Sequence, residues 1–208
     1  MILSTVLSRQ TPVTIASARS LEAYQESWNN MVIREVMRPQ IVNCAKQIAK
    51  YRRNFELAVN GTKVPWQFAG IIYFREDGLQ FKGHPHNGDS LRRRTVNVPA
   101  GRPVASPKYA DGYSFMESFA DLIALKRWDK VPVWNMPSLL YYFESNNGFG
   151  YRRLHNPIMT PYLWSGTNYY TSGKFIADGH YDQQTVDKQV GAAPLLRYLT
   201  DKTLGIID

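Results

Sequence analysis

The sequence predicts a mainly α-helical domain with a small lobe that is either a β-hairpin or an ordered loop. Apolar residues recur at helical spacing in several separate segments, which is typical of amphipathic helices that share one core. Residues 66–74 are apolar on nearly all sides, so we expect a short, buried helix at the centre of a helical bundle. Prolines and glycines gather between residues 83 and 103, where they predict the small lobe.

The other helices are expected from their apolar stripes and boundary signals over residues 20–37, 39–59, 114–128, 137–145 and 182–199. Ser114 and Glu117 have the spacing of a capping box, in which each side chain satisfies a backbone N–H of the first turn. Pro137 suits the first turn of its helix. Asp182 can cap the last helix, which Pro194 is expected to kink or restart.

Length and composition predict one domain with an appended arm. The chain has 208 residues, of which 44% are hydrophobic, enough for a single core. Residues 1–19 lack a helical period and are expected to form an extended arm before a single domain over residues 20–208. The single cysteine, Cys44, excludes an intrachain disulfide and is expected in the core.

The charge of the chain points to a polyanionic partner. The formal net charge is +8, which favours nucleic acid, an anionic membrane surface or a bacterial cell wall. Residues 92–94 are three consecutive arginines, and this run taken alone indicates a solvated loop rather than a binding site. No segment is long and apolar enough to span a bilayer, and Arg9 and Pro12 interrupt the region where a secretory signal would need its apolar core. We therefore expect synthesis in a cytoplasm without a signal peptide.

Glu76 is the main candidate for catalysis. It lies in the last turn of the central helix, before Gly78, which can end a helix in the left-handed conformation. The partial negative charge of a helix C-terminus and apolar neighbours both raise the pKa of a carboxyl group. A carboxyl group that stays protonated near neutral pH can act as a general acid. The alternative is a solvated helix end, paired with Arg75.

A polar cluster, His84-Pro85-His86-Asn87-Gly88-Asp89, permits three interpretations. Two histidines and an aspartate can bind zinc, but the chain lacks a second spaced pair of ligands, so we expect no metal and no cofactor. Asn87-Gly88-Asp89 can equally form a tight turn. In the third interpretation, Asp89 or Asn87 faces Glu76 across a cleft and orients water or stabilises positive charge. Residues 95–98 could form a strand nearby.

An ordered set of sequence blocks resembles a known family. The blocks include Arg-Glu at residues 75–76, His-x-His-Asn-Gly-Asp-x-Leu at 84–91, Val-Pro-Ala-Gly-Arg-Pro at 98–103, Asn-Gly-Phe-Gly-Tyr-Arg at 147–152, Pro-Tyr-Leu-Trp-Ser at 161–165 and Gly-Lys-Phe-Ile-Ala-Asp-Gly at 173–179. Together they resemble phage endolysin-like lysozyme family proteins, which are related to lytic transglycosylases and goose-type lysozymes. The resemblance covers residues 51–196. Asp77 departs from it, because the wider superfamily usually has Ser there. A second negative charge beside Glu76 could raise the pKa of Glu76 further, or the departure could mean that this site differs from the family pattern.

The resemblance implies a lysozyme-like fold and cleavage of the β-1,4 bond between N-acetylmuramic acid and N-acetylglucosamine in peptidoglycan. Glu76 would be the acid and Asp89 a helper. Residues expected to bind the glycan are His86, Asn87, Thr95, Asn147, Gly148, Tyr151, Tyr169 and Tyr170. Residues 144–148 resemble the motif that lines the sugar cleft of lytic transglycosylases, although a plain helix cap fits them as well. Of Tyr169 and Tyr170, one is expected to pack inside and the other to meet ligand.

The expected partners are peptidoglycan glycan strands and an anionic wall or membrane surface, with no specific nucleic acid, and the expected state is a monomer. The protein would reach the cell wall through a holin or a virion. Water could attack the sugar, giving a hydrolase, or the 6-hydroxyl of muramic acid could do so, giving an anhydro sugar. Two other classes stay open. One is a basic protein that binds nucleic acid through arginines and tyrosines, and the other is an inactive virion protein with a lysozyme fold.

Overall fold

The computed structural model describes residues 21–177 and 179–201, so the arm expected over residues 1–19 lies outside the described residues. This part of the chain is mainly α-helical with a small antiparallel sheet, as the sequence predicts. The elements are α1 (Leu21–Asn29), η2 (Glu35–Met37), α2 (Arg38–Lys50), α3 (Arg52–Ala58), α4 (Trp66–Asp77), α5 (Phe115–Lys126), η3 (Trp128–Lys130), α6 (Met136–Asn147), η4 (Gly150–Arg153), α7 (Pro161–Trp164), β1 (Lys174–Ala177), β2 (His180–Asp182) and α8 (Ala192–Thr200). No helix in the described ranges has the length and apolarity that a membrane crossing needs.

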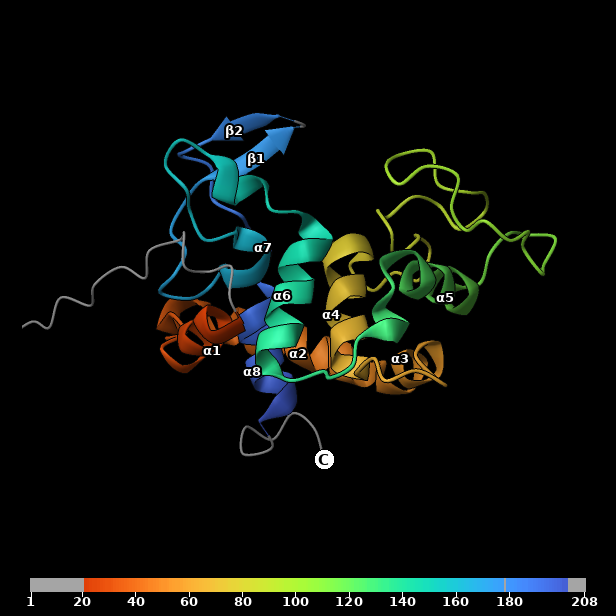
Figure 1. Ribbon diagram of the computed structural model, residues 1–208, viewed down its shortest axis with the longest axis horizontal. Helices are drawn as coiled ribbons and strands as arrows, with labels where there is room; N and C mark the ends of the chain where they lie inside the picture. The colour runs from red at the N-terminus through yellow and green to blue at the C-terminus, as the bar shows by residue number, and fades with distance from the viewer. Residues whose placement is uncertain (1–20, 178, 202–208) are drawn as a thin grey trace, which may run out of the picture.

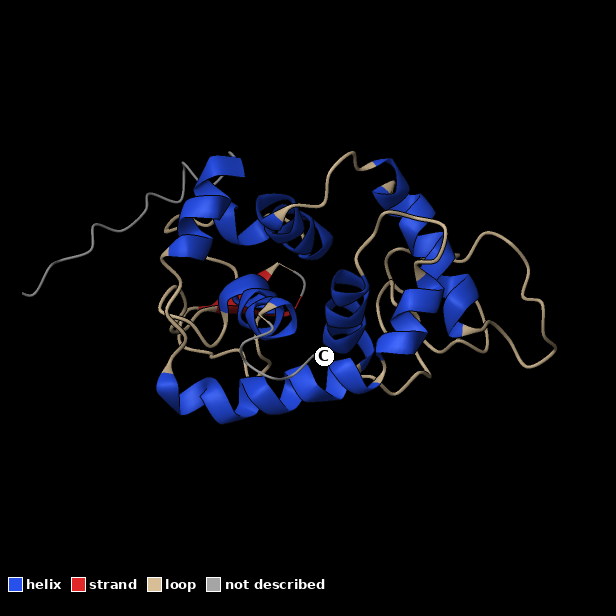
Figure 2. Cartoon of the chain, turned by 90° about the horizontal axis from the view of Figure 1, so that it is seen from below, coloured by secondary structure: helices blue, strands red, loops and turns tan. Residues whose placement is uncertain are grey.

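Helix α4 is the central element of the fold (Figure 1). Helices α2, α3, α6 and α8 pack against it, and the view from below shows helices on its several sides (Figure 2). Its middle residues, 68–73, are buried, and Gly70 lets Ile48 and Phe55 approach the helix backbone closely. The helix ends where Gly78 adopts a φ of 61°. The sequence prediction of a buried central helix ending at Gly78 is therefore confirmed.

Several helix boundaries differ from the prediction. Helix α1 stops at Asn29, because the following backbone pairs with another segment: the Val32 N–H donates to Asn168 Oδ1, and the Arg34 N–H donates to the carbonyl of Gly166. The helix expected over residues 39–59 is divided at Tyr51 into α2 and α3. The capping box of Ser114 and Glu117 is present at the start of α5, as predicted.

Of the two alternatives predicted for the small lobe at residues 83–103, the structure has the ordered loop, and the small sheet lies elsewhere in the chain. Residues 83–103 form a loop without the expected strand at 95–98, because the polar groups of this loop are satisfied mainly by one another rather than by a neighbouring strand. Strands β1 and β2 lie instead within residues 174–182 and pair antiparallel. The last helix starts at Ala192 rather than near Asp182, whose carboxylate accepts bonds from the Gln184 N–H and the Thr185 hydroxyl in a turn.

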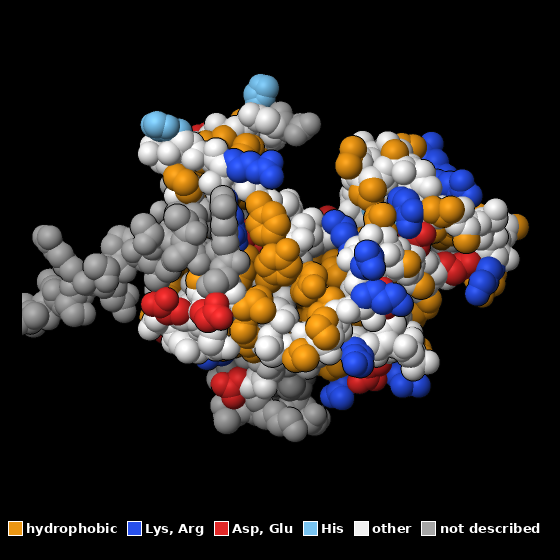
Figure 3. Space-filling model, viewed as in Figure 1, with side chains coloured by type: hydrophobic (Ala, Val, Ile, Leu, Met, Phe, Trp, Pro, Cys, Tyr) orange, Lys and Arg blue, Asp and Glu red, His pale blue; other side chains and the backbone are white. Residues whose placement is uncertain are grey.

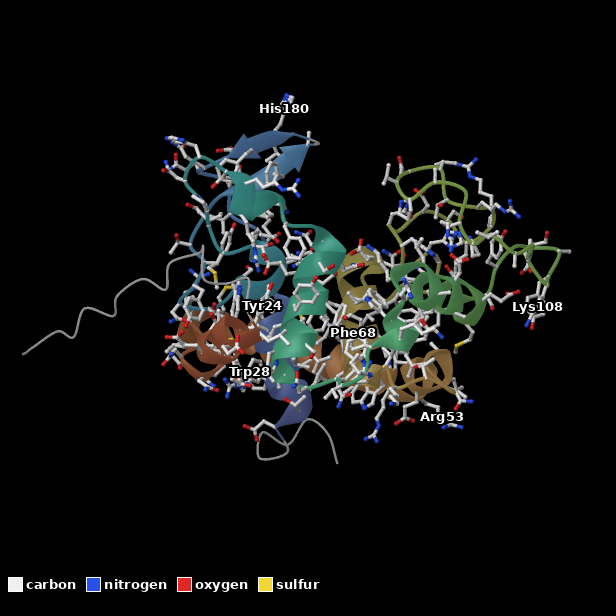
Figure 4. All side chains as sticks on the ribbon, in the orientation of Figure 1. Tyr24, Trp28, Arg53, Phe68, Lys108 and His180 are labelled. Atoms are coloured by element: carbon white, nitrogen blue, oxygen red, sulfur yellow. The ribbon has the colours of Figure 1, made fainter. Side chains whose placement is uncertain are left out.

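Two lobes flank the C-terminal end of α4. The first, called here the hairpin lobe, contains η4, α7, β1 and β2, whereas the second, called the loop lobe, comprises residues 78–113 and packs beside α5 (Figure 1). The space-filling view shows a notch between the two lobes (Figure 3). His180 at the start of β2 and Lys108 in the loop lobe lie on opposite sides of it, and Phe68 lies in the core below (Figure 4). The fold thus places the end of α4 between two largely non-helical segments.

Candidate active site

Glu76 lies in the last turn of α4, where the helix leaves the core. The pKa of its carboxyl group is raised from the ordinary value of 4.5 to about 7, and burial is the largest cause. The charges of Arg75 and Lys126 and a hydrogen bond from Tyr162 all act in the opposite direction, so desolvation outweighs them. Near neutral pH a substantial fraction of this carboxyl group therefore keeps its proton.

The hydrogen bonds of Glu76 decide which oxygen carries that proton. The Tyr162 hydroxyl donates to Oε1 at 3.2 Å, and the Asn146 side-chain amide donates to the same oxygen at 3.4 Å. Burial raises the pKa of Tyr162 as well, so its hydroxyl stays a donor. No described residue donates to Oε2. In the neutral acid the proton therefore resides on Oε2, the oxygen without a protein donor.

A cavity of about 550 Å³ opens beside Glu76. Its walls come from the end of α4, the turn after α6, helix α7, strand β1 and the segment around Asp187. Tyr151 and Phe175 line it with their rings packed edge to face at 4.9 Å, so the cavity offers aromatic surface as well as polar groups. Concave sites of this size are typical of small-molecule binding.

One wall of the cavity is a network of charged residues. Asp187 is buried and accepts a bond from Arg75 Nη2 at 3.1 Å and from Lys174 Nζ at 2.8 Å. The Arg75 guanidinium also donates to the Val190 carbonyl and lies 4.5 Å from the centre of the Tyr162 ring. These contacts, above all the Arg75 charge, keep the pKa of Asp187 below its ordinary range. The alternative interpretation of Glu76 assumed an ion pair with Arg75. In the structure Arg75 pairs with Asp187 instead.

A buried network fixes the turn that forms another part of the cavity. Glu144 of α6 accepts bonds from the Tyr24 hydroxyl at 2.6 Å and from Arg152 Nε at 2.6 Å, and Arg152 also contacts the Tyr24 hydroxyl. This network ties α1, α6 and η4 together. It holds the neighbouring Tyr151 in place, and the Tyr151 hydroxyl accepts a bond from the Phe175 N–H of β1.

The structure brings Glu76 together with three of the residues predicted to bind the glycan. Asn147, Gly148 and Tyr151 line the same cavity as Glu76. Asn147 itself reaches Thr160, whereas its neighbour Asn146 is the amide that contacts Glu76. Which of these two neighbouring asparagines faces Glu76 depends on the helical phase of α6, which a single sequence does not fix.

Asp89 lies in the loop lobe, and its carboxylate is used within that lobe. It accepts bonds from the Val96 and Asn97 N–H groups, each at 2.8 Å, and from the side chains of Asn97 and Asn87. Desolvation acts to raise the pKa of Asp89, but the bonds from Asn97, Val96 and Asn87 together outweigh it and hold that pKa below its ordinary range. Asp89 does not line the cavity. The structure therefore shows Asp89 organising its own loop outside this cavity, and its expected role beside a reacting sugar stays a prediction.

The other loop-lobe residues among the predicted site residues also serve the loop. Asn87 donates to the carbonyl of Asn97, and Thr95 binds the backbone of Pro99 and Arg102. His86 is buried, with Nε2 2.9 Å from Asp121 Oδ2, and desolvation lowers its pKa to about 4. His86, Asn87 and Thr95 do not line the Glu76 cavity, so this geometry does not support their predicted contact with a ligand there.

Tyr169 and Tyr170 also lie away from the cavity lining. Tyr169 packs against Trp164, and the buried Tyr170 donates to the Gly173 carbonyl while accepting a bond from the Asp187 N–H. Tyr170 therefore positions the Asp187 segment instead of touching a ligand. The expectation that one of the pair packs inside is confirmed, and the expectation that the other contacts a ligand at this cavity is not supported.

Asp77, the departure from the family pattern, points away from Glu76. Its carboxylate accepts a weak bond from the Lys82 N–H at 3.4 Å and lies close to Gly83, where an added Cβ would come within 2.3 Å of Oδ1. Asp77 is not among the groups that shift the pKa of Glu76. The pKa of Glu76 is therefore raised by desolvation and not, as suggested, by the charge of Asp77.

Sequence reasoning did not select Tyr162, Asn146, Lys174 or Asp187, which complete the site. Tyr162 and Lys174 lie in blocks that carry the family resemblance, and Asn146 lies in the motif-like segment 144–148, so a signal for these three existed. Asp187 had no such signal, because its partner Arg75 is 112 residues away in the chain. Within the described ranges, no group of three or more His, Cys, Asp or Glu side chains could hold a metal ion.

Comparison of the sequence with models of protein families finds no match, and comparisons with curated proteins and with solved structures likewise find no similar protein.

Replacing Tyr162 with Phe is expected to raise the pKa of Glu76 further. The hydroxyl stabilises the ionised carboxylate more than the neutral acid, so its removal favours the protonated form. An NMR titration of the Glu76 side-chain carboxyl carbon measures this pKa. Tyr169→Phe is the control, since its hydroxyl is not bonded to Glu76. Equal Glu76 pKa values in the wild type and in Tyr162→Phe would contradict the assigned role of Tyr162.

Proposed function

We propose that the protein is a glycosidase that cleaves the β-1,4 bond between N-acetylmuramic acid and N-acetylglucosamine in peptidoglycan. The observation that carries this proposal is the raised pKa of the Glu76 carboxyl group, about 7, at a cavity wide enough for a sugar. Such a group can protonate a glycosidic oxygen at neutral pH, which a carboxyl group of ordinary pKa does poorly.

The lining of the cavity supports a glycan as the ligand. The ring of Phe175 provides a flat apolar surface of the kind on which sugar rings stack, and the Asn147 amide and backbone groups near Gly148 offer hydrogen bonds to hydroxyl and acetamido groups. The sequence blocks that resemble lysozyme family proteins include four of these wall segments, around residues 76, 147, 161 and 174. Peptidoglycan is the substrate class that this resemblance implies.

The proposed reaction uses Glu76 as the sole acid and base. Glu76 Oε2 donates its proton to the glycosidic oxygen as the bond from that oxygen to C1 of muramic acid breaks. The resulting carboxylate is stabilised by the Tyr162 and Asn146 donors on Oε1. The 6-hydroxyl oxygen of the same sugar then bonds to C1 and passes its proton to Glu76, which restores the acid.

Attack by the sugar's own hydroxyl is favoured over attack by water because a water-activating carboxylate is missing from the described lining. Hydrolysing glycosidases generally use a second carboxylate as base or nucleophile. Among the described cavity residues the only other carboxylate is Asp187, which two cations already hold. The products are therefore expected to end in 1,6-anhydromuramic acid.

Digestion of purified peptidoglycan tests the proposal. After incubation with the full-length protein, the released muropeptides are analysed by mass spectrometry, in which a hydrolysed end is heavier than an anhydro end by one water. Anhydro ends are expected. Reducing muramic acid ends would retain the glycosidase proposal and reject intramolecular attack. Intact glycan strands after prolonged digestion would reject the glycosidase proposal itself.

A further inference from the structure

We infer that the cavity wall formed by Arg75, Asp187 and Lys174 recognises a carboxylate on the substrate, and that Lys174 is the residue that contacts it. This inference rests on the proposed function, because it concerns the same cavity. It adds a specificity-determining residue and a chemical class of substituent to that proposal.

The three side chains Arg75, Asp187 and Lys174 together carry a net charge of +1. Asp187 supplies a single negative charge, with its side chain 2% exposed, and it is paired with two cations. Arg75 alone would neutralise it, since their side chains are both buried and hydrogen-bonded to each other. Lys174 therefore adds a net positive charge at the edge of the cavity, where a partly desolvated charge attracts an anion more strongly than it would in bulk water.

Of the two cations that pair with Asp187, Lys174 is the one that a ligand can reach. The Arg75 side chain is 5% exposed and fixed by Val190, by Asp187 and by the ring of Tyr162. The Lys174 side chain is 37% exposed, and its ammonium group has three donors, of which Asp187 takes one. The bond to Asp187 holds the ammonium group in place before a ligand arrives, which lowers the entropy cost of binding.

The surroundings of Lys174 fit an anionic group attached to a sugar. Lys174 and Phe175 are adjacent in β1, and both line the cavity together with Tyr151. A sugar ring against the aromatic surface would bring its substituents to the strand that carries the ammonium group. Peptidoglycan offers carboxylates in two forms, namely the lactyl carboxylate of muramic acid without peptide and the carboxylates of an attached stem peptide.

The test compares three forms of one N-acetylglucosamine–N-acetylmuramic acid tetrasaccharide, with free lactyl carboxylates, with the same carboxylates converted to methylamides, or with stem peptides attached. For each form, kcat/KM is measured with the wild type and with Lys174→Met. We expect the substitution to lower kcat/KM for one of the carboxylate forms by about tenfold more than for the methylamide, which is the loss expected for a charge-assisted hydrogen bond. The form that suffers this loss identifies the source of the carboxylate.

Two variants control for other effects of the substitution. Lys174→Arg keeps the charge and is expected to retain the preference for the carboxylate form. Lys130→Met removes an exposed lysine of η3, away from the cavity, and is expected to behave as the wild type. Thermal unfolding of Lys174→Met is measured in parallel, and because Asp187 keeps its bond to Arg75 in this variant, the fold should be retained.

The outcomes separate the two proposals. If Lys174→Met changes kcat/KM equally for all three forms, or for none, the carboxylate inference is overturned while the glycosidase proposal stands. If the wild type cleaves none of the three, the proposed function fails and the inference fails with it.

Discussion

Glu76→Gln is expected to lower the rate of the proposed peptidoglycan cleavage by about 10²–10⁴-fold, which is the usual contribution of a general acid. The amide has nearly the same shape and can still accept the Tyr162 and Asn146 bonds, but it has no proton that it can give to a glycosidic oxygen. The rate at which glycan fragments are released from purified peptidoglycan measures the effect. Glu56→Gln is the matched control, because Glu56 lies on α3 and its ion pairs within the described residues are with Arg52 and Arg53 of the same helix.

The wild-type pH profile should agree with this assignment. Since the acid form is the active one and the pKa of Glu76 is about 7, the rate is expected to fall as pH rises above 7. A rate that is unaffected by Glu76→Gln, or that increases above pH 7 in the wild type, would remove Glu76 from the mechanism.

The same substitution should stabilise the fold at alkaline pH, and that result would show that the loss of cleavage is not a loss of folding. The pKa of Glu76 is raised in the folded state, so the folded protein holds this proton more tightly than the unfolded chain does. Its contribution to stability is therefore lost as pH rises from 4.5 through 7. The difference corresponds to about 3 kcal/mol. Relative to the wild type, Glu76→Gln should gain up to about that amount in urea unfolding between pH 4.5 and pH 8.

Asp187→Ala is expected to have the largest effect on stability, about 3–5 kcal/mol of unfolding free energy at pH 7. The substitution leaves the buried guanidinium of Arg75 without its counter-charge and removes the partner of Lys174. Arg75 Nε is already buried without a hydrogen-bond partner in the described part of the chain, so the loss of Asp187 leaves a second nitrogen of the same buried group unpaired. Urea unfolding measured by circular dichroism gives the difference.

Two comparisons separate this effect from a general cost of removing an aspartate. Asp129→Ala breaks an ion pair with the exposed Lys130 and should cost less than about 1 kcal/mol. In the double variant Arg75→Met, Asp187→Ala the unpaired buried charge is gone, so part of the lost stability should return. If Asp187→Ala lowers the unfolding free energy no more than Asp129→Ala does, the pair of Arg75 and Asp187 contributes little to the stability of the fold.

The sequence by itself determined the local features of this protein. The all-round apolar run of residues 66–74 specified a buried helix, and Gly78 specified its end, because the burial of apolar surface and the left-handed conformation of glycine act over a few neighbouring residues. The raised pKa of Glu76 was predictable for the same reason. The capping box of Ser114 and Glu117 was equally local.

Only the tertiary structure decided which distant residues complete the site. The family resemblance implied that Asp89 assists Glu76, yet the loop uses Asp89 to satisfy its own N–H groups. Tyr162 reaches Glu76 across 86 residues. Such pairings depend on how α4 and the hairpin lobe pack, and residue spacing along the chain does not fix the distance between packed elements.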